Sequence, residues 1–334
     1  MNLRPPFISR IPWYRLIVRP LLFRLPPEPA QRVADAALSA RPLWRAYAKV
    51  ANIPNNSTLV ANLELRNRVG LAAGLDKRCA YLGSLGDLGF GYVVGGTVTH
   101  DPRPGNPKPR VLRLPSESSL INALGFPGDG LNAAAARLRK LQNPPSSIWV
   151  SIAALEEQET KKCLITLEPL VDAIELNISS PNTAGLRRFQ DPFALRALLE
   201  LLNEVRSKPL FIKIPPYRSD TERDDVMALV RVSRETGVNG ITAANTVPIE
   251  DARLAMGRGG LSGVAILADM LRIVAEVRKE AGHQIVINAC GGIATAQEAQ
   301  QALDSGANTV QIYTSMVYRG PGVVANIVKG LARN

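Results

Sequence analysis

Residues 173–182 read Ala-Ile-Glu-Leu-Asn-Ile-Ser-Ser-Pro-Asn, a short apolar run that ends in polar and turn-forming residues. Ala173–Ile178 has the length and composition of a buried β-strand, and Asn177, Ser180 and Asn182 stand where that strand ends. Similar runs recur along the chain after residue 55. Together they are Val69–Ala73, Tyr92–Gly96, Ile148–Ile152, Ala173–Ile178, Leu210–Ile214, Gly240–Ala244, Gln284–Ala289 and Thr309–Ile312.

Stretches with helical periodicity separate these runs, which is typical of parallel strands joined by helices. They include Leu131–Gln142, Asp191–Arg206, Thr221–Thr236, Ala265–Ala281 and Thr295–Ser305. Eight strand–helix units predict an α/β fold, a (β/α)8 TIM barrel over residues 55–334 with a small helical appendage over residues 1–54. A doubly wound open sheet is the alternative, but its usual G-x-G-x-x-G turn is absent after Val69–Ala73.

Polar residues gather at the ends of the eight runs. They are Lys77, Thr97, Ser151, Asn177, Ser180, Asn182, Lys213, Asn245, Thr246, Gly291, Gly292, Tyr313 and Thr314. In a closed barrel these positions surround one mouth, where such enzymes place their active sites. Polar loops are also common in any soluble barrel, but the regular placement favours a single site assembled from every strand.

Composition removes several kinds of chemistry. The three cysteines are far apart and form no C-x-x-C pair, which argues against a zinc site or an iron–sulfur cluster. With only two histidines, a histidine-based triad or a multi-histidine metal site is not expected, and no metal is predicted. The chemistry must rest on lysine, serine, asparagine or a cofactor.

Positive charge is concentrated at the N-terminus. Residues 1–50 hold nine basic and two acidic side chains, a net charge of +7 out of +11 for all 334 residues. Trp13 and Trp44 lie in the same segment. From Ile11 to Leu25 apolar residues recur every three or four positions, which predicts an amphipathic helix that Pro20 should kink or divide. Two more helices are expected, at Pro29–Leu38 and around Leu43–Val50.

This segment predicts peripheral membrane association. No apolar stretch is long enough to span a bilayer, but basic residues near an anionic leaflet contribute roughly 1 kcal/mol each, and interfacial aromatic residues add to this. In a bacterium this would place the protein at the cytoplasmic face of the cell membrane. The alternative is a helical cap on the barrel with solvated arginines. Nucleic acid is not an expected partner, because no reading motif accompanies the charge.

Several motifs in this order resemble the dihydroorotate dehydrogenase family. They are Gly74-Leu75-Asp76-Lys77, Ile121-Asn122, Asn177-Ile178-Ser179-Ser180-Pro181-Asn182-Thr183, Gly260-Leu261-Ser262-Gly263 and Gly291-Gly292-Ile293. The segments 22–29 and 103–110 resemble the class 2, membrane-associated branch. The resemblance implies FMN-dependent oxidation of dihydroorotate to orotate, a step of pyrimidine biosynthesis, with electrons passed to a membrane quinone.

The resemblance also implies site residues. Substrate binding is expected from Lys77, Asn122, Asn177, Asn182, Asn245 and Thr246. FMN binding is expected from Ala73, Gly74, Lys77, Thr97, Ser151, Asn177, Lys213, Ala244, Gly263, Gly292, Tyr313 and Thr314. Amides suit a ring edge that alternates donors and acceptors, because each amide offers both.

Two residues are expected to be catalytic. Ser180 matches the base of the class 2 branch, where class 1 enzymes carry cysteine, and a serine needs assistance to act as a base. Lys213 should point into the barrel mouth, where the resemblance places it beside the flavin and where its charge would stabilise the reduced, anionic form. The alternative for Lys213 is a pair with a buried carboxylate.

The chain departs from the family pattern around the flavin. Ser151-Ile152-Ala153-Ala154-Leu155 stands where Asn-Ile-Gly-Lys-Asn is usual, Ala244 replaces a threonine, Ala123 replaces an arginine, and Pro127-Gly128 replaces an asparagine pair. Each lost neutral hydrogen bond costs on the order of 1 kcal/mol, so weaker FMN binding is expected.

Three other functions are compatible with the sequence. A related flavin barrel could act on another pyrimidine-like substrate, a lyase could use Lys213 as a Schiff-base amine, and a weakly active or non-catalytic paralogue could retain only membrane binding.

Overall fold

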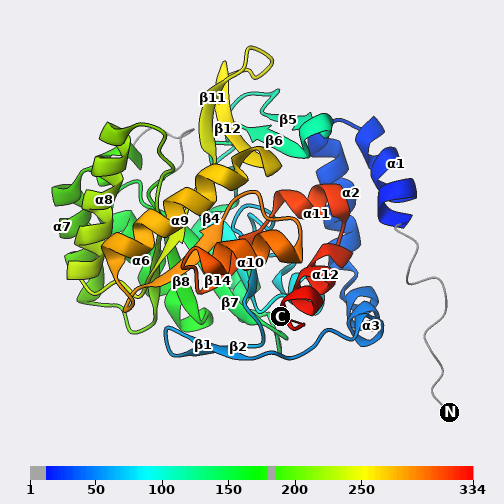
Figure 1. The fold of residues 1–334 in the computed structure, drawn as a ribbon, viewed down its shortest axis with the longest axis horizontal. Helices are drawn as coiled ribbons and strands as arrows, with labels where there is room; N and C mark the ends of the chain where they lie inside the picture. Colours follow the sequence, from blue (N-terminus) through cyan, green and yellow to red (C-terminus); the bar gives the residue numbers. More distant parts are fainter. Residues whose placement is uncertain (1–12, 180–185, 334) are drawn as a thin grey trace.

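The eight predicted strands form a closed parallel barrel in the computed structural model, which describes residues 13–179 and 186–333 (Figure 1). Their order around the barrel is β10-β13-β14-β3-β4-β7-β8-β9. The bounds are β3 Val69–Leu71, β4 Tyr92–Val98, β7 Ser147–Ala153, β8 Ala173–Asn177, β9 Leu210–Lys213, β10 Gly240–Ala243, β13 Val286–Cys290 and β14 Thr309–Ile312. The prediction of a TIM barrel is confirmed.

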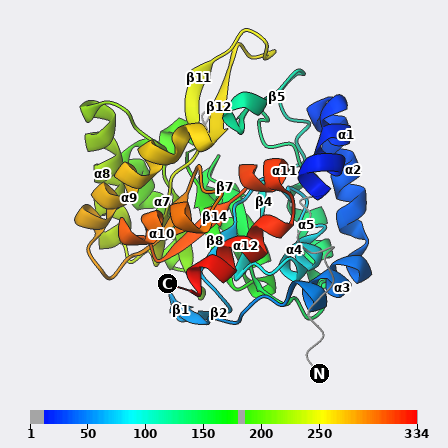
Figure 2. The same ribbon diagram turned by 45° about the vertical axis from the view of Figure 1, so that its right-hand side comes forward.

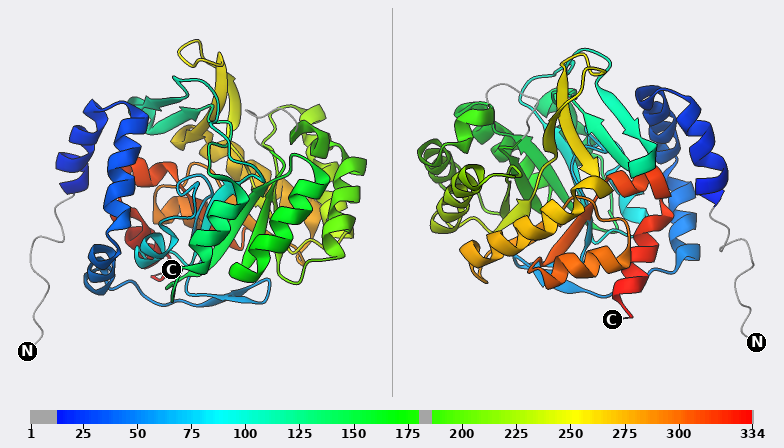
Figure 3. Two further views of the ribbon diagram at one scale, coloured as in Figure 1. Left: turned by 180° about the vertical axis from the view of Figure 1, so that it is seen from behind. Right: turned by 45° about the horizontal axis from the view of Figure 1, so that its top comes forward.

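Helices surround the barrel (Figure 1, Figure 3). They are α4 Leu82–Asp87, α5 Gly130–Arg139, α6 Glu157–Leu167, α7 Pro192–Asn203, α8 Asp220–Glu235, α9 Leu267–Ala281, α10 Ala296–Asp304, α11 Thr314–Arg319 and α12 Gly322–Leu331. Local signals fix where several begin. Asp191 caps α7, and capping boxes at Ser219 with Glu222 and at Thr295 with Glu298 begin α8 and α10. Helices α4, α6, α11 and α12 were not predicted.

Alternation along the strands separates an apolar floor from a polar mouth inside the barrel. On the floor Trp149 stacks between Tyr92 and Phe211, with ring centroids 4.1 and 4.3 Å away. Val60 and Leu65, from the hairpin of β1 Thr58–Val60 and β2 Leu63–Leu65, close this end. Two residues further along β7, β8 and β9 the inward positions become polar, at Ser151, Glu175 and Lys213, because a strand repeats its face every second residue. The floor supports the site and leaves the opposite end open.

A second, antiparallel sheet rises above the mouth (Figure 1). Its strands, in the order β11-β12-β6-β5, are β5 Val111–Leu114, β6 Ser119–Asn122, β11 Val247–Glu250 and β12 Arg258–Gly263. These short strands lie within what the sequence suggested were loops of the barrel. The sheet brings Asn122 to the mouth, since β6 pairs with β12 there.

The N-terminal segment consists of helices that lie along one side of the barrel (Figure 2). A π-helical turn, Tyr14–Val18, leads into α1 Arg19–Arg24, and α2 Pro27–Ser39 and α3 Arg41–Ala51 follow. Pro20 does not divide the first helix, because it lies in the first turn of α1, where a missing N–H is tolerated. The Tyr14 hydroxyl donates to the Val317 carbonyl at 2.8 Å, which attaches this segment to α11. Within the described ranges, none of the helices has the length and apolar character needed to cross a bilayer.

We expect Glu28→Gln to loosen the attachment of α2. Buried Arg110 donates to Glu28 Oε1 through Nε at 3.1 Å and through Nη2 at 2.9 Å, and it also bonds the Pro104 and Asn106 carbonyls. Glutamine keeps an acceptor oxygen but loses the negative charge, and hydrogen bonds to charged groups contribute about 1.5–3 kcal/mol, so thermal unfolding should occur a few degrees lower. Lys108→Ala is the control, since its contact with Glu28 is 3.6 Å long and its side chain is 65% exposed. Equal effects of both variants would contradict this assignment.

Candidate functional site

One large cavity runs from the barrel mouth outward to the N-terminal helices. Its volume is about 2310 Å³, well above the 300–1,000 Å³ or so of a typical small-molecule pocket. It therefore has room for more than one ligand. The predicted site residues that line it are Ala73, Gly74, Lys77, Thr97, Asn122, Asn177, Lys213, Ala244, Asn245, Thr246, Gly263, Gly292, Tyr313 and Thr314.

One predicted site residue among the described ones, Ser151, does not line this cavity. Ser151 is fully buried behind Thr97, and its hydroxyl lies 3.0 Å from the Thr97 hydroxyl. Ser151 therefore does not contact the cavity directly and acts through Thr97. Ser180 and Asn182 lie outside the described residues, and their roles stay predictions.

A chain of hydrogen bonds orients the polar side chains of the mouth. Asn245 Nδ2 donates to Ser179 Oγ at 2.9 Å, and the Ser179 hydroxyl donates to Asn177 Oδ1 at 3.2 Å. Asn177 Nδ2 donates in turn to Thr97 Oγ1 at 3.2 Å, next to Ser151. Both amides are thus fixed in orientation before any ligand binds, which is what precise recognition of a ring edge requires.

Lys77 stands at the edge of the cavity on a turn that Asp76 holds in place. The Asp76 carboxylate accepts from the backbone N–H groups of Ala80 and Tyr81 at 2.9 and 2.6 Å. Lys77 Nζ donates to the Gly74 carbonyl at 2.7 Å. Burial lowers the pKa of Lys77, while nearby Asp35 and Asp76 oppose this shift. The result is a compact cation that titrates below the usual range for lysine.

Lys213 is a buried lysine at the inner end of the mouth. Its side chain is 5% exposed, and strand β9 pairs it with Asn177 of β8 and Thr242 of β10. Burial lowers its pKa, but Cys290 and the Glu175 carboxylate raise it, and the net shift is upward. Burial also raises the pKa of the Cys290 thiol, and Glu175 is the carboxyl group that raises the pKa of Lys213. Lys213 therefore stays protonated.

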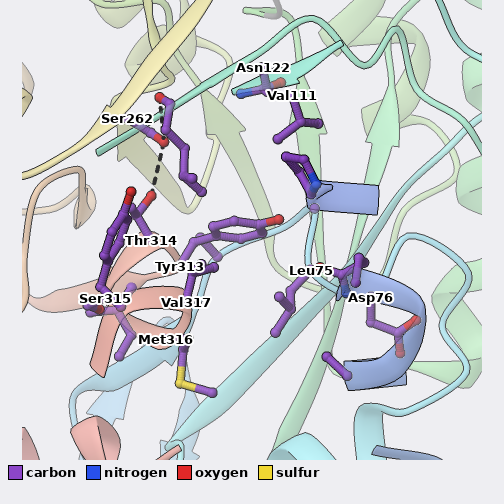
Figure 4. Close-up of a pocket in the computed structure, with 18 of the residues that line it drawn as sticks. Leu75, Asp76, Val111, Asn122, Ser262, Tyr313, Thr314, Ser315, Met316 and Val317 are labelled. Carbon is purple, nitrogen blue, oxygen red and sulfur yellow. Dashed lines mark hydrogen bonds between the residues drawn. The ribbon is translucent and has the colours of Figure 1, made fainter. Parts of the chain in front are cut away.

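Glycines and a hydroxyl cluster form the opposite wall. Gly74 has φ +107°, and a Cβ added there would meet only Tyr313, at 3.8 Å, so it would point into the cavity. The Thr314 and Ser262 hydroxyls lie 2.9 Å apart, and Tyr313 lies between them and Leu75 (Figure 4). Among the described residues, the buried hydroxyl of Ser315 has no hydrogen-bond partner.

The outer half of the cavity is mainly apolar. Leu75, Val111, Met316 and Val317 line it, and several of their side chains approach Tyr313 in the close-up (Figure 4). Residues of α1 and α2 complete the wall on the outer side. An apolar passage thus joins the polar mouth to the N-terminal helices.

Sequence reasoning missed four polar residues of the site. Ser179, Ser315 and Cys290 lie beside residues that were predicted, and Glu175 lies one strand repeat before Asn177. A signal for Glu175 was present, because strict alternation along Ala173–Asn177 turns its side chain to the same face as Asn177. A carboxylate at an inward position of a barrel strand is rare, so the pattern indicates a polar site around Glu175.

Comparison with known proteins agrees with this architecture. Residues 56–334 match the family model described as Dihydroorotate dehydrogenase. Curated relatives named dihydroorotate dehydrogenase (quinone) include one from Novosphingobium aromaticivorans, 36% identical over 95% of this chain and 94% of the relative, and one from Leifsonia xyli, 38% identical over 96% and 98%.

Solved structures of DHODH from Eimeria tenella have the same fold. The complex with ferulenol has a TM-score of 0.79 and 29% identity over 92% of this chain and 91% of that one. The ligand-free form has a TM-score of 0.76 and 30% identity over 84% and 87%. From the family match and the curated relatives together, the chain belongs to the dihydroorotate dehydrogenase family, in its class 2 branch.

Proposed function

We propose that this protein oxidises dihydroorotate to orotate with bound FMN and passes the electrons to a membrane quinone. The observation that carries the proposal is the single cavity in which Asn122, Asn177, Asn245 and the two lysines meet at one end, while an apolar passage leads from the other end to exposed N-terminal helices. Such an arrangement suits a polar substrate and an apolar electron acceptor on either side of a redox cofactor.

The described residues fit an FMN cofactor. The volume is sufficient, Gly74 leaves space that a Cβ would fill, and Thr314 lines the cavity with a hydroxyl group. Bound FMN would supply the acceptor for the hydride equivalent of the substrate and the electrons for the quinone. Lys213, buried and protonated, supplies a fixed positive charge that would stabilise negative charge developing in the mouth.

Substrate recognition falls to the amides and to Lys77. Asn177 and Asn245 are held by the hydrogen bonds through Ser179, so each presents a defined donor and acceptor to a ring edge. Lys77 offers a charge-assisted hydrogen bond to a carboxylate. These residues bind and orient dihydroorotate, and proton removal is assigned to Ser180 by the family resemblance.

Ala244 and Ser151 stand where the family pattern has a threonine and an asparagine expected to contact FMN. Ala244 is 3% exposed at the end of β10, and Ser151 bonds Thr97 and does not line the cavity. We expect tighter FMN binding in relatives that keep the threonine and the asparagine, by roughly fivefold for each hydrogen bond of about 1 kcal/mol.

The absorbance spectrum of the purified protein tests the proposal. A flavin spectrum that bleaches on anaerobic addition of dihydroorotate is the expected result. Bleaching with dihydrouracil and not dihydroorotate would assign another pyrimidine-like substrate. A colourless preparation that takes up no FMN would support a non-catalytic paralogue.

A Schiff-base lyase is disfavoured by the environment of Lys213. Such an amine must be neutral to attack a carbonyl, and enzymes lower its pKa for this purpose. Here the pKa of Lys213 is raised by Cys290 and Glu175, despite burial. Borohydride should therefore trap no substrate on Lys213, and covalent trapping would overturn the flavoprotein assignment.

We also propose that residues 13–50 bind peripherally to a membrane, at the cytoplasmic face of the cell membrane in a bacterium. Large apolar side chains of this segment are exposed, namely Trp13, Leu16, Ile17, Leu21, Leu25, Val33, Leu43 and Val50. Basic side chains are exposed among them, at Arg15, Arg24, Arg32, Arg45 and Lys49. This combination of apolar and basic exposure is typical of interfacial helices, and the apolar passage of the cavity reaches the same helices.

Lys77 should make substrate affinity depend on pH. The ammonium form binds the substrate carboxylate, and it is present below the pKa of Lys77 and lost as pH rises through it. Because burial lowers this pKa from 10.5, KM for dihydroorotate should begin to rise below pH 10.5 while kcat changes less. Lys77→Arg keeps the charge to higher pH and should flatten the rise. A wild-type KM that is constant to pH 10.5 would contradict this role.

A further inference from the structure

A buried carboxylate lies on β8, one strand repeat below the level of Lys213, and the substrate and cofactor contacts proposed above do not include it. Glu175 of β8 is 0% exposed. Its Oε2 accepts from the Thr242 hydroxyl at 2.8 Å and from Gln311 Nε2 at 3.4 Å. Thr242 is the residue that β10 pairs with Lys213, so Glu175 and Lys213 occupy neighbouring levels inside the barrel.

The hydrogen bonds around Glu175 run in one direction. Tyr92 and Thr309 share a hydrogen bond of 2.7 Å, and the Thr309 hydroxyl donates to Asn288 Oδ1 at 2.7 Å. Asn288 Nδ2 then donates to Thr242 Oγ1 at 3.3 Å, which leaves the Thr242 hydrogen for Glu175. Because each hydroxyl has a single hydrogen, this order makes Glu175 the acceptor at the end of the chain.

These contacts leave Glu175 only partly compensated. Its Oε1 has no hydrogen-bond partner in the described structure, and an isolated charge in such a place is expensive unless an opposite charge lies near. Lys213 is the cation that interacts with it, and Cys290 of β13 is the other titratable group facing Lys213. The Cys290 thiol is neutral at pH 7 because burial raises its pKa.

We propose that Glu175 is a positioning residue that holds Lys213 as a cation at the barrel mouth. The proposal deepens the proposed function and rests on it for the effect on FMN, but the pairing of the two charges can be tested without a cofactor. Removal of the carboxylate leaves burial to act on Lys213 with little opposition, so the lysine loses its proton at lower pH. Removal of Lys213 instead leaves the Glu175 carboxylate buried without an opposite charge.

A double-mutant cycle tests the pairing in the full chain without added flavin. Glu175→Gln and Lys213→Met are each expected to lower the unfolding temperature, and the double variant should unfold at a higher temperature than either one, because neither charge is then left alone. Additive losses would overturn the proposal. Should Glu175→Gln not fold, recovery of folded protein by adding Lys213→Met supports the pairing, and failure to recover it contradicts the pairing.

Glu168→Gln is the matched control. Glu168 is also a buried carboxylate, 6% exposed, but it accepts from Ser207 and Lys208 away from the mouth. Its loss should be additive with Lys213→Met, since the two sites share no partner. If Glu168→Gln were coupled to Lys213→Met as strongly as Glu175→Gln is, the cycle would report general destabilisation of the barrel, and the proposal would be overturned.

The midpoint potential of bound FMN provides a readout that a purely structural role would not move. In Glu175→Gln the midpoint potential should fall more steeply with pH over the alkaline range where Lys213 deprotonates. The slope should increase by about 30 mV per pH unit, because reduction then takes up one extra proton in a two-electron couple. The wild-type slope should not change there. Identical slopes would overturn the proposal, whereas an intact cycle with no reduction by dihydroorotate would count against the proposed function alone.

Discussion

Ser180→Ala should slow the reduction of bound FMN by dihydroorotate by about two to four orders of magnitude, the usual contribution of a positioned acid or base. Ser180 directly follows Ser179, whose hydroxyl is bonded to both Asn177 and Asn245 at the mouth. Its loss should therefore affect proton removal and leave the two amides in place. Anaerobic stopped-flow absorbance at the flavin band measures the rate, and the remaining rate should rise with pH as hydroxide replaces the missing base.

Ser180→Cys distinguishes a lost base from a disturbed loop. Class 1 relatives carry cysteine at this place, and a thiol ionises more readily than a hydroxyl. The cysteine variant should therefore recover part of the rate, with an optimum at lower pH than that of the wild type. Equal rates in the alanine and cysteine variants would mean that Ser180 is not the base.

The barrel could be predicted because its strands leave a local trace in the sequence. Each is a short apolar run, and parallel strands buried on both faces keep that pattern whatever the tertiary context. The antiparallel sheet of β5, β6, β11 and β12 left no such trace. Its strands are short, and β12 carries three glycines, so only pairing with distant neighbours makes them strands.

The location of the site was predictable for the same reason, but its internal contacts were not. Strand ends indicated which residues share the mouth, and the described ones do line a single cavity apart from Ser151. The orientation of Ser151 toward Thr97 depends on packing between β4 and β7. Likewise the position of Glu175 below Lys213 depends on the register of β8, β9 and β10, which no local pattern specifies.

The N-terminal helices show how a sequence pattern can be right in outline and differ in detail. Three helical stretches were predicted, and the structure has helices in each region. However, the first continues through Pro20, which lies in the first turn of α1 after a π-helical turn. Part of the predicted apolar stripe remains exposed, since Ile17 and Leu21 are each more than half exposed, whereas Tyr14, Val18 and Leu22 are half-buried. This exposure leads to the second large effect that we expect.

Replacing Leu16, Ile17 and Leu21 together with serine should weaken binding to anionic vesicles by about two to three orders of magnitude. The three side chains are 64%, 55% and 56% exposed on two successive helical turns, and burying an aliphatic side chain contributes about 1.5–3 kcal/mol when burial is complete. Partial insertion of three such residues therefore accounts for about 3–4 kcal/mol, which corresponds to that loss in affinity. Co-sedimentation with vesicles of mixed anionic and neutral lipid measures it.

A matched triple variant separates membrane insertion from a general loss of apolar surface. Ile165, Phe193 and Met256 are also exposed, at 50%, 84% and 41%, but they lie on the barrel and its hairpin, away from the N-terminal helices. Their replacement by serine should leave vesicle binding unchanged, and reduction of the flavin by dihydroorotate should proceed normally in both triple variants.

Turnover with quinone gives a second readout. Only the N-terminal triple variant should lose turnover with a long-chain quinone embedded in vesicles. A short water-soluble quinone should restore this turnover, because the electron acceptor then reaches the apolar passage from solution. If both triples bind vesicles as the wild type does, the exposed N-terminal residues are not a membrane-binding surface.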